Sequence, residues 1–330
     1  MQEANTKLEW ISKISPSKGL IFFGCADLAL EKDAVRFEQW LSEEKNAGMA
    51  FLENHIEKRT NPKALFPGSQ SALCFALPYE HQCEQKTISK SAMYACFKDY
   101  HHVIKKNIGE ILSEVFEQDE EFINNNFKVC VDSVPLLERA LLAKTSGFIG
   151  KNTCFIHTEH GSYLLLGVLL SKIKFKANEA KPVDHSIRSE NGGCGTCSRC
   201  QTHCPTGALD EAYQLDARKC LSYWSIEHRG TVPQKYWKYF GEYYFGCDIC
   251  QNVCPYNRHK KSRTHDFHRN TDISLKQIAL MDQKEYVAWF SGTPMTRAKI
   301  FGLKRNAILA MYALSDPDLR EVCDLSLIHI

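Results

Sequence analysis

Eight of the 15 cysteines in this 330-residue chain lie between Cys194 and Cys254 and form two related motifs. The first motif separates four cysteines by two, two and three residues and ends in Cys-Pro. The second repeats the last part of this spacing, also ends in Cys-Pro, and is preceded by Cys220. Cysteines at such intervals wrap a loop around one iron–sulfur cluster, while the cysteine before the proline reaches the neighbouring cluster. The two motifs therefore predict two 4Fe–4S clusters.

This crossover divides the eight cysteines into two sets. The first cluster takes Cys194, Cys197, Cys200 and Cys254, and the second takes Cys204, Cys220, Cys247 and Cys250. Zinc is the alternative, but a zinc ribbon needs only two CxxC pairs, whereas both motifs here continue to a Cys-Pro. The other cysteines, Cys154 among them, lie mostly in apolar runs and are expected to be buried small hydrophobic residues.

The compartment decides whether clustered cysteines bind metal or form disulfides. Residues 19–30 (GLIFFGCADLAL) follow several lysines and could pass for a signal peptide, but Gly24 and Asp27 interrupt the apolar run. This favours a buried strand over an export signal. No window approaches the ~18 uninterrupted apolar residues of a membrane span. We therefore expect a globular cytoplasmic protein that makes no contact with a membrane.

Periodicity divides the chain into three parts and predicts an α+β fold class. Residues 1–180 mix helical spacing, as in 103–117, with β-rich runs such as 71–79, and predict an α/β domain. Residues 181–262 contain the cysteine motifs and predict a ferredoxin-like domain with two clusters. Residues 263–330 return to helical spacing and predict a short helical subdomain.

Basic residues are concentrated in the C-terminal half, although the net charge of the whole chain is only +2. Residues 217–310 hold 16 Lys and Arg against 7 Asp and Glu, and the densest basic run is 257–263. Aromatic residues lie among these charges between Tyr223 and Tyr239. A single basic run is usually a solvated loop, and many of the rings could belong to a core. The alternative is a surface that binds a polyanion and stacks on unpaired bases.

Asp132 is the second candidate for chemistry, because it follows a β-rich run and precedes a helical pattern. An aspartate at such a junction is usually an N-cap, and position alone favours that role over catalysis. The nearby glycine-rich segment 147–152 invites comparison with a phosphate loop, but it lacks the Walker spacing and the hydroxyl residue. Asp99-Tyr100-His101 also lacks the downstream glycine of the DxHxxG motif, which supplies a cobalt ligand in some corrin proteins.

Beyond the cysteines, the whole chain resembles the epoxyqueuosine reductase family, which catalyses the last step of queuosine biosynthesis. The matching segments follow one another along nearly the entire sequence and are far more specific than the ferredoxin motif alone. They are EKRTNPKALFPGSQSAL (57–73), KDYHHVIKK (98–106), VDSVPLLERALLAKTSGFIGKNT (131–153), GSYLLLG (161–167), CGTCSRCQTHCPTGAL (194–209), CLSYWSIEHRG (220–230), FGCDICQNVCPYNR (245–258) and GTPMTRAKIFGLKRNAILA (292–310).

The resemblance implies a second cofactor, cobalamin in base-off form, held between residues 1–180 and the iron–sulfur domain, with HEAT-like helices following. The clusters would pass single electrons to cobalt, and reduced cobalt would act on the epoxide of epoxyqueuosine to give queuosine. Asp132 matches the family's proton donor, which reverses the preference for a cap; general acid catalysis contributes ~10²–10⁴-fold. The implied corrin contacts are Arg59, Asp132, Phe155, Leu166, Leu169 and Ser222.

The implied partners are a tRNA with a queuosine-type wobble base and an external electron donor similar to flavodoxin or ferredoxin, and we expect a monomer. Basic side chains would neutralise tRNA phosphates. The candidates are Arg229, Lys235, Arg258, Lys260, Lys261 and Arg263.

Other functions stay open at this point. An electron carrier for a partner enzyme would explain the cysteines but would leave Asp132 and the basic half without a use. A corrinoid reductase similar to the reductive dehalogenases shares the same cofactors but fits poorly with a basic half and no export signal. A tRNA-binding protein with purely structural clusters is the third alternative.

Overall fold

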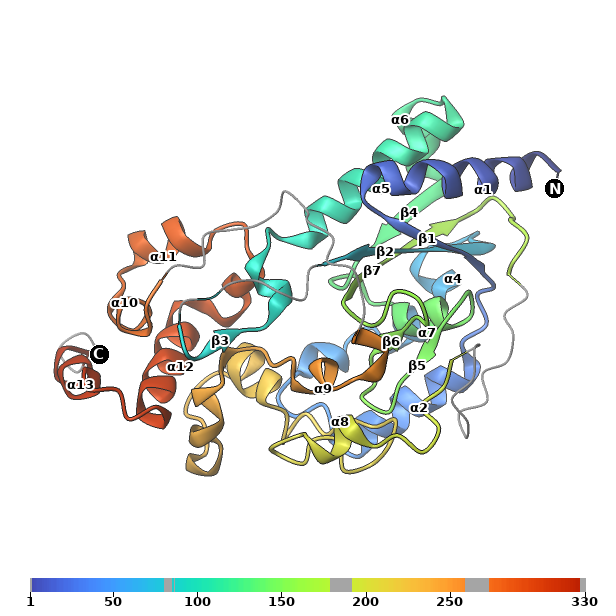
Figure 1. The fold of residues 1–330 in the computed structure, drawn as a ribbon. Helices are drawn as coiled ribbons and strands as arrows, with labels where there is room; N and C mark the ends of the chain where they lie inside the picture. Colours follow the sequence, from blue (N-terminus) through green and yellow to red (C-terminus); the bar gives the residue numbers. More distant parts are fainter. Residues whose placement is uncertain (1, 80–84, 86, 179–191, 259–272, 327–330) are drawn as a thin grey trace.

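The computed structural model describes residues 2–79, 85, 87–178, 192–258 and 273–326 (Figure 1). The candidate tRNA contacts Lys260, Lys261 and Arg263 lie outside these residues. No helix in the described ranges is both long and apolar enough to cross a membrane. The mixture of helices and strands that the sequence predicts is confirmed.

A four-stranded antiparallel sheet organises the N-terminal part (Figure 1). Its strands, in spatial order, are β1 (Ile21–Ala26), β2 (Ser71–Pro78), β7 (Leu164–Ser171) and β4 (Phe127–Cys130). Strands β2 and β7 pair without interruption from Ser71 opposite Ser171 to Pro78 opposite Leu164. Every residue of β2 is buried, which explains why its sequence is a continuous apolar run rather than an alternating one.

Helices close both faces of this sheet. One face packs against α1 (Gln2–Ile14) and α5 (Tyr100–Phe116), whose buried residues follow the predicted helical spacing. The close approach of α5 requires Gly167 on β7, because a Cβ atom there would lie 2.7 Å from Ile104 Cγ2. The other face is covered by α7 (Glu138–Ala143) and the residues before it. The turn after β4 therefore lies at the edge of a rigid core.

The cysteine-rich part is built from turns and very short elements. Two one-turn helices, α8 (Arg199–Thr202) and α9 (Ile249–Asn252), carry the ends of the two motifs. Strand β3 (Lys90–Ser91) pairs in parallel with β8 (Tyr243–Phe245), which ties the segment before α5 to the cysteine-rich part. Other short helices and strands, all in the N-terminal part, are α3 (Ile56–Thr60), α4 (Pro62–Leu65), α6 (Glu120–Asn126), β5 (Phe148–Ile149) and β6 (Phe155–Ile156).

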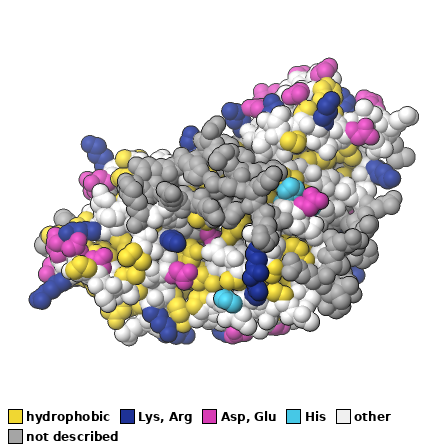
Figure 2. Space-filling view, in the orientation of Figure 1, with side chains coloured by type: hydrophobic (Ala, Val, Ile, Leu, Met, Phe, Trp, Pro, Cys, Tyr) yellow, Lys and Arg dark blue, Asp and Glu magenta, His cyan; other side chains and the backbone are white. Residues whose placement is uncertain are grey.

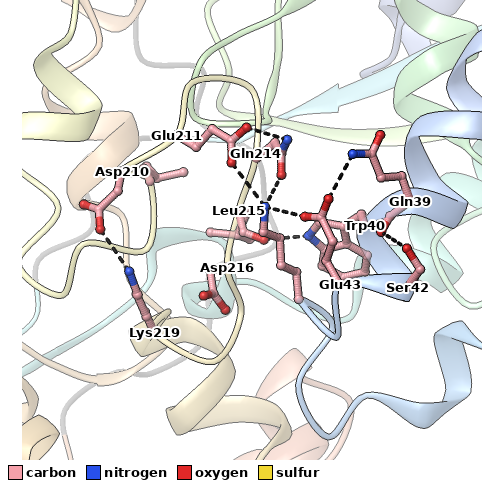
Figure 3. A network of polar contacts seen from close by, with 12 residues as sticks. Gln39, Trp40, Ser42, Glu43, Asp210, Glu211, Gln214, Leu215, Asp216 and Lys219 are labelled. Carbon is pink, nitrogen blue, oxygen red and sulfur yellow. Dashed lines mark hydrogen bonds and ion pairs between the residues drawn. The ribbon is translucent and has the colours of Figure 1, made fainter.

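A polar network fastens α2 (Glu31–Ser42) to the segment between the two cysteine motifs (Figure 3). Trp40 Nε1 donates to the carbonyl of Leu215 at 2.6 Å. The ammonium of Lys45 lies 2.6 Å from Glu43 and 3.2 Å from Glu211, and it also contacts Gln214. Exposed ion pairs of this kind contribute only ~0–1 kcal/mol each. The half-buried tryptophan bond is therefore the firmer attachment.

Four helices form the C-terminal part, on the far side of the molecule from α1 (Figure 1). They are α10 (Leu275–Leu280), α11 (Gln283–Phe290), α12 (Lys299–Ala313) and α13 (Leu319–Ser326). Helix α12 packs on the aromatic segment Gln234–Gly241. Tyr223 and Tyr236 are buried, Tyr236 within the shared core, and Trp224, Trp237 and Tyr239 pack against that core. The structure thus favours the core interpretation for Tyr223 and Tyr236, while Trp224, Trp237 and Tyr239 stay partly exposed.

Two adjacent side chains of α12 hold the π-helical turn Tyr223–Glu227 and the residues after it. Arg305 donates to three backbone carbonyls of the segment 224–230, at distances of 2.7 to 3.0 Å. The fully buried Asn306 donates to the carbonyl of Ser225 at 2.6 Å and accepts from Arg305 at 2.9 Å. Buried backbone carbonyls need partners, and these two residues supply them from a distant part of the chain.

We expect Asn306→Ala to lower the free energy of unfolding by about 1–3 kcal/mol, because it leaves the buried carbonyl of Ser225 without its donor. Urea unfolding of the anaerobically purified protein, followed by circular dichroism, measures the loss. Phe301→Ala on the same helix is the control: its ring is 78% exposed, and the change should stay below about 0.5 kcal/mol. Equal losses in the two variants would contradict the assigned role of Asn306.

Candidate functional site

The structure gathers the eight cysteines of the two motifs into two groups. One group lines a single cavity and comprises Cys194, Cys197, Cys200 and Cys254. In the other group, burial raises the pKa of Cys247, and the thiols of Cys220 and Cys204 raise it further. Cys250 lies close enough to Cys247 and Cys220 to be affected in the same way. The two groups have the same members as the two sets that the motif spacing predicts.

Both groups have the donor chemistry of an iron–sulfur site. Burial, reinforced by neighbouring thiols, raises the pKa of Cys200 and of Cys254 to about 11. Such thiols become thiolates together only when a cation neutralises them, and a coordinated metal does this outright. Backbone N–H groups also donate to the sulfur atoms, as Tyr256 does to Cys254 and Ile249 does to Cys247. The residues present therefore fit 4Fe–4S clusters.

The local fold explains how the cysteines reach these positions. Helices α8 and α9 each carry one cysteine in their single turn and end before the Cys-Pro pair, because proline cannot continue a helix. Gly246, immediately before Cys247, has φ +69°, and a Cβ atom there would lie 2.5 Å from the Cβ of Ala92. Only glycine fits this turn, which directs the next cysteine into its group.

A turn of the N-terminal part, residues 150–154, touches the first cysteine group. The backbone N–H of Lys151 donates to Cys194 Sγ at 3.4 Å. The ammonium group of the same residue donates to the carbonyls of Gly195 and Cys197, at 2.8 and 3.0 Å. The lysine is half-buried and lines the cavity that the four thiols share.

The same turn also touches the second cysteine group. Asn152 Nδ2 donates to the carbonyl of Cys250 at 3.4 Å, and the thiol of Cys154 hydrogen-bonds to that of Cys250. Sequence reasoning missed this contact, because it treated Cys154 as a small hydrophobic residue. The glycine-rich segment 147–152, which resembles a phosphate loop only in part, was the sequence signal for this turn.

Asp132 lies in the turn after β4, in the left-handed region with φ +44°, and its side chain is 70% exposed. It does not cap a helix, since α7 begins at Glu138 with Leu137 at its N-cap position. The cap interpretation is therefore wrong. Tyr100 Oη instead donates to Asp132 Oδ2 at 2.8 Å, and His101 Nε2 lies 3.5 Å from the same oxygen.

These contacts couple two titrating groups. The hydrogen bond from His101 is the main cause that lowers the pKa of Asp132, and Tyr100 lowers it further. The same bond, with a second one to Asp99 at 2.6 Å, raises the pKa of His101. Near neutral pH the pair therefore favours a carboxylate on Asp132 and a proton on His101. The site holds one transferable proton next to an exposed carboxylate.

Arg59 and Glu138 each leave a buried polar atom, Nε and Oε1 respectively, without a partner among the described residues. Burial raises the pKa of Glu138 to about 8 and lowers that of Arg59. Each of the two also feels the charge of Asp132. Orphaned buried donors and acceptors are rare in native proteins, and a ligand that bonds to them is one explanation. A corrin ring fits here, because the amide side chains on its rim can both donate and accept hydrogen bonds.

The other predicted corrin contacts are placed differently. Phe155 is 3% exposed and packs inside the core between the sheet and α7. Leu166 lies at the margin of that core, whereas Leu169 is fully buried on the opposite face of β7, against α5. Residues three apart on a strand point to opposite faces, so the two leucines do not face one ligand. Leu169 offers it no side-chain surface. Ser222 is partly exposed, and its backbone N–H donates to Cys220.

The described tRNA candidates are spread out. Arg229 donates to the carbonyls of Ile226 and Arg297, at 2.8 and 2.6 Å, so its guanidinium already has partners within the chain. Lys235 and Arg258 are exposed. Figure 2 shows Lys and Arg side chains at scattered positions on the face drawn, with Asp and Glu side chains near several of them.

Two family models match the chain. A "4Fe-4S double cluster binding domain" covers residues 193–257, which include all eight motif cysteines. "Epoxyqueuosine reductase QueG, DUF1730" covers residues 59–133, from Arg59 to just beyond Asp132. The first of these models supports iron–sulfur binding by residues 193–257.

Several solved structures share the fold. A crystal structure of epoxyqueuosine reductase with an epoxyqueuosine-modified tRNA-Tyr stem loop superposes with a TM-score of 0.82 at 25% identity, covering 95% of this chain and 83% of that one. A Bacillus subtilis epoxyqueuosine reductase, with the aspartate catalytic loop swung out of its active site, gives a TM-score of 0.80 at 25% identity and covers 94% and 82%.

Curated relatives extend the match in sequence. Epoxyqueuosine reductase of Cellulophaga algicola is 33% identical over 284 residues, which cover 84% of this chain and 89% of the relative. The enzyme of Cyclobacterium marinum is 31% identical over 302 residues, covering 90% and 94%. Identity at this level over nearly the full length of both chains, together with the shared fold and the matched models, shows that this chain belongs to the epoxyqueuosine reductase family.

Proposed function

We propose that this protein reduces epoxyqueuosine in tRNA to queuosine, with electrons passing through two 4Fe–4S clusters to cobalamin. The observation that carries the proposal is the position of Arg139, which connects the cysteines to the acid–base pair. The charge of Arg139 lowers the pKa of Asp132 and of Cys154, in each case after stronger hydrogen bonds. Its guanidinium also donates to the carbonyl of Thr153 at 2.7 Å. An electron carrier would need no such link to a proton donor.

The eight motif cysteines would be the cluster ligands, in the two sets that the crossover gives. Their burial and the backbone donors to their sulfur atoms support this role. Cys154, on which the charge of Arg139 acts, hydrogen-bonds to Cys250 of the second group, whereas it affects Cys254 of the first group through its charge alone. We therefore infer that the second cluster lies on the substrate side. The first cluster would receive electrons from the external donor.

Arg59 and Glu138 would bind the rim of cobalamin, with Leu166 and Ser222 at its margin. When bound, cobalamin supplies a strongly reducing cobalt centre for breaking the carbon–oxygen bonds of the epoxide. The guanidinium of Arg59 would donate to an amide carbonyl of the ring. Glu138, whose pKa of about 8 keeps its carboxyl group mostly protonated at neutral pH, would donate to another. Both orphaned atoms would then have partners.

Reduction of the epoxide to an alkene consumes two electrons and two protons and releases the oxygen as water. An oxygen leaving carbon as a bare alkoxide is a poor leaving group, so it needs a proton as the bond breaks. Asp132 alone is a weak source, because its pKa is lowered. His101, whose pKa is raised, would hold the proton, and Asp132 would pass it to the oxygen. Tyr100 would keep the carboxylate in position.

The substrate and location follow from the same proposal. tRNA phosphates would contact Lys235 and Arg258, together with Lys260, Lys261 and Arg263 outside the described residues. The reducing cytoplasm, where tRNA is found, would also keep the cysteines available for iron.

Anaerobic reconstitution with iron, sulfide and cobalamin, followed by a single-turnover assay on tRNA containing epoxyqueuosine, tests the function. We expect queuosine, detected by nucleoside mass spectrometry, only when cobalamin and both clusters are present. Iron bound at about two clusters per chain, with no corrinoid and no product, would instead support the electron carrier. Asp132→Asn is the matched variant: it should bind tRNA normally and lose about 10²–10⁴-fold in rate. Full activity in that variant would exclude the proton-donor role.

The rate should also fall as pH rises through the pKa of His101, because the donor then loses its proton. Since that pKa is raised, the fall should lie above the ordinary value of about 6.5 for histidine. His101→Gln should be slower and should lack this basic limb, and its remaining activity should follow the carboxyl of Asp132 at lower pH. Single-turnover rates across pH measure both profiles, with the exposed neighbour His102→Gln as control. An unchanged basic limb in His101→Gln would contradict the assignment.

Binding to tRNA should depend on salt through the exposed cations. Changing Lys235 and Arg258 to Gln should reduce the slope of log K against log[salt] by about one for each phosphate that is no longer neutralised. Fluorescence anisotropy with labelled tRNA at several salt concentrations gives the slope. Lys32→Gln, an exposed cation on α2, should leave it unchanged. If the double variant matched this control, neither residue would contact phosphate.

A further inference from the structure

The glycine-rich segment 147–152, which fails as a phosphate loop, places a cation beside the first cysteine group. Lys151 lines the same cavity as the four thiols and contacts the group in three ways. Its backbone N–H reaches Cys194 Sγ at 3.4 Å, and its ammonium reaches the carbonyls of Gly195 and Cys197. Both the peptide dipole and the side-chain charge are therefore directed at this group.

The surrounding turn holds the lysine in place. Gly150 N–H donates to the carbonyl of Cys154 at 2.9 Å, and Thr153 N–H donates to the carbonyl of Gly150 at 2.8 Å. The carbonyl of Lys151 accepts from the backbone N–H of Tyr213 at 3.2 Å, so the cysteine-rich part fixes it from the other side. A charge held in this way acts on the site continuously, unlike a solvated lysine that samples many positions.

A cation at the position of Lys151 affects the reduction potential of a neighbouring cluster. A cluster held by four thiolates is an anion, and reduction by one electron adds further negative charge. Its potential depends on net charge, on hydrogen bonds to the sulfur atoms and on solvent exposure. A fixed, half-buried cation stabilises the reduced form more than the oxidised form, because its interaction is less screened than that of an exposed charge.

We propose that Lys151 is a positioning residue that raises the reduction potential of the first cluster. The step concerned is the gain of one electron by the oxidised cluster from an external one-electron reductant; no bond is made or broken. The inference rests on the two-cluster part of the proposed function. The glycine-rich segment would then act in a way similar to a phosphate loop. A lysine and a backbone N–H group stabilise an anion, which here is an iron–sulfur cluster instead of a phosphate.

EPR-monitored potentiometry with dithionite on the reconstituted full chain tests this proposal. In Lys151→Met we expect one of the two midpoint potentials to fall. At a fixed applied potential, the ratio of reduced to oxidised cluster should drop about tenfold, which corresponds to about 59 mV for one electron. Lys151→Arg should stay within about threefold of the wild type. Arg199→Met is the matched control: Arg199 lines the same cavity but is exposed, so its removal should shift the potential less.

Three results would overturn the proposal. They are wild-type potentials in Lys151→Met with both clusters intact, an equal fall in Lys151→Arg, or an equal fall in Arg199→Met. If Lys151→Met loses a cluster, Lys151→Gln, which keeps a donor for the two carbonyls, replaces it. Loss of the cluster in both variants would mean that the lysine holds the site together and does not tune it. The iron and sulfide content of the wild type tests the proposed function separately, because a chain that binds no clusters would contain neither.

Discussion

Ligation of iron by buried thiols is the interaction on which the cysteine-rich part depends. The apolar cluster around the first cysteine group is small, comprising Phe148, Ile156, Cys254 and Tyr256, and two of these residues belong to the N-terminal part, whereas residues 221–245 join the larger C-terminal core. Burial and neighbouring thiols raise the pKa of Cys200 and of Cys247, so without metal these thiols stay protonated and contribute little. Binding free energy is then folding free energy, as in other small metal-bound domains. Loss of iron should therefore loosen this part before it affects the N-terminal sheet.

The N-terminal part provides the rigid frame for the reaction. Strand β7 and helix α5 fix the turn that carries Asp132, and α5 itself begins with Tyr100 and His101, which bind that carboxylate. The turn 150–154 extends the same frame to both cysteine groups. In the proposed mechanism, neighbouring turns of one core would therefore position both electron transfer and proton transfer.

The sequence predicted well those features that depend on local spacing. The division of the cysteines follows from two related spacing motifs, and the pattern of α5 is encoded within 17 residues, so pattern reasoning predicted both. Contacts across the fold were beyond it. Lys151 meets Cys194 from 43 positions away. The opposite facing of Leu166 and Leu169, by contrast, follows from the alternation of side chains once both are placed on strand β7. From the sequence, the aromatic residues after Cys220 could form a binding surface, but in the fold they pack in or against the core that includes α12.

Because the turn after Cys220 depends on α12, the order in which the chain is synthesised affects when this turn can form. Arg305 and Asn306 supply the donors for this turn, and both are synthesised long after the cysteine itself. During translation the second cysteine group therefore lacks its final backbone conformation until residues 305 and 306 have left the ribosome. Insertion of the second cluster should follow completion of the C-terminal helices, whereas α1 to α7 can fold earlier around their own sheet.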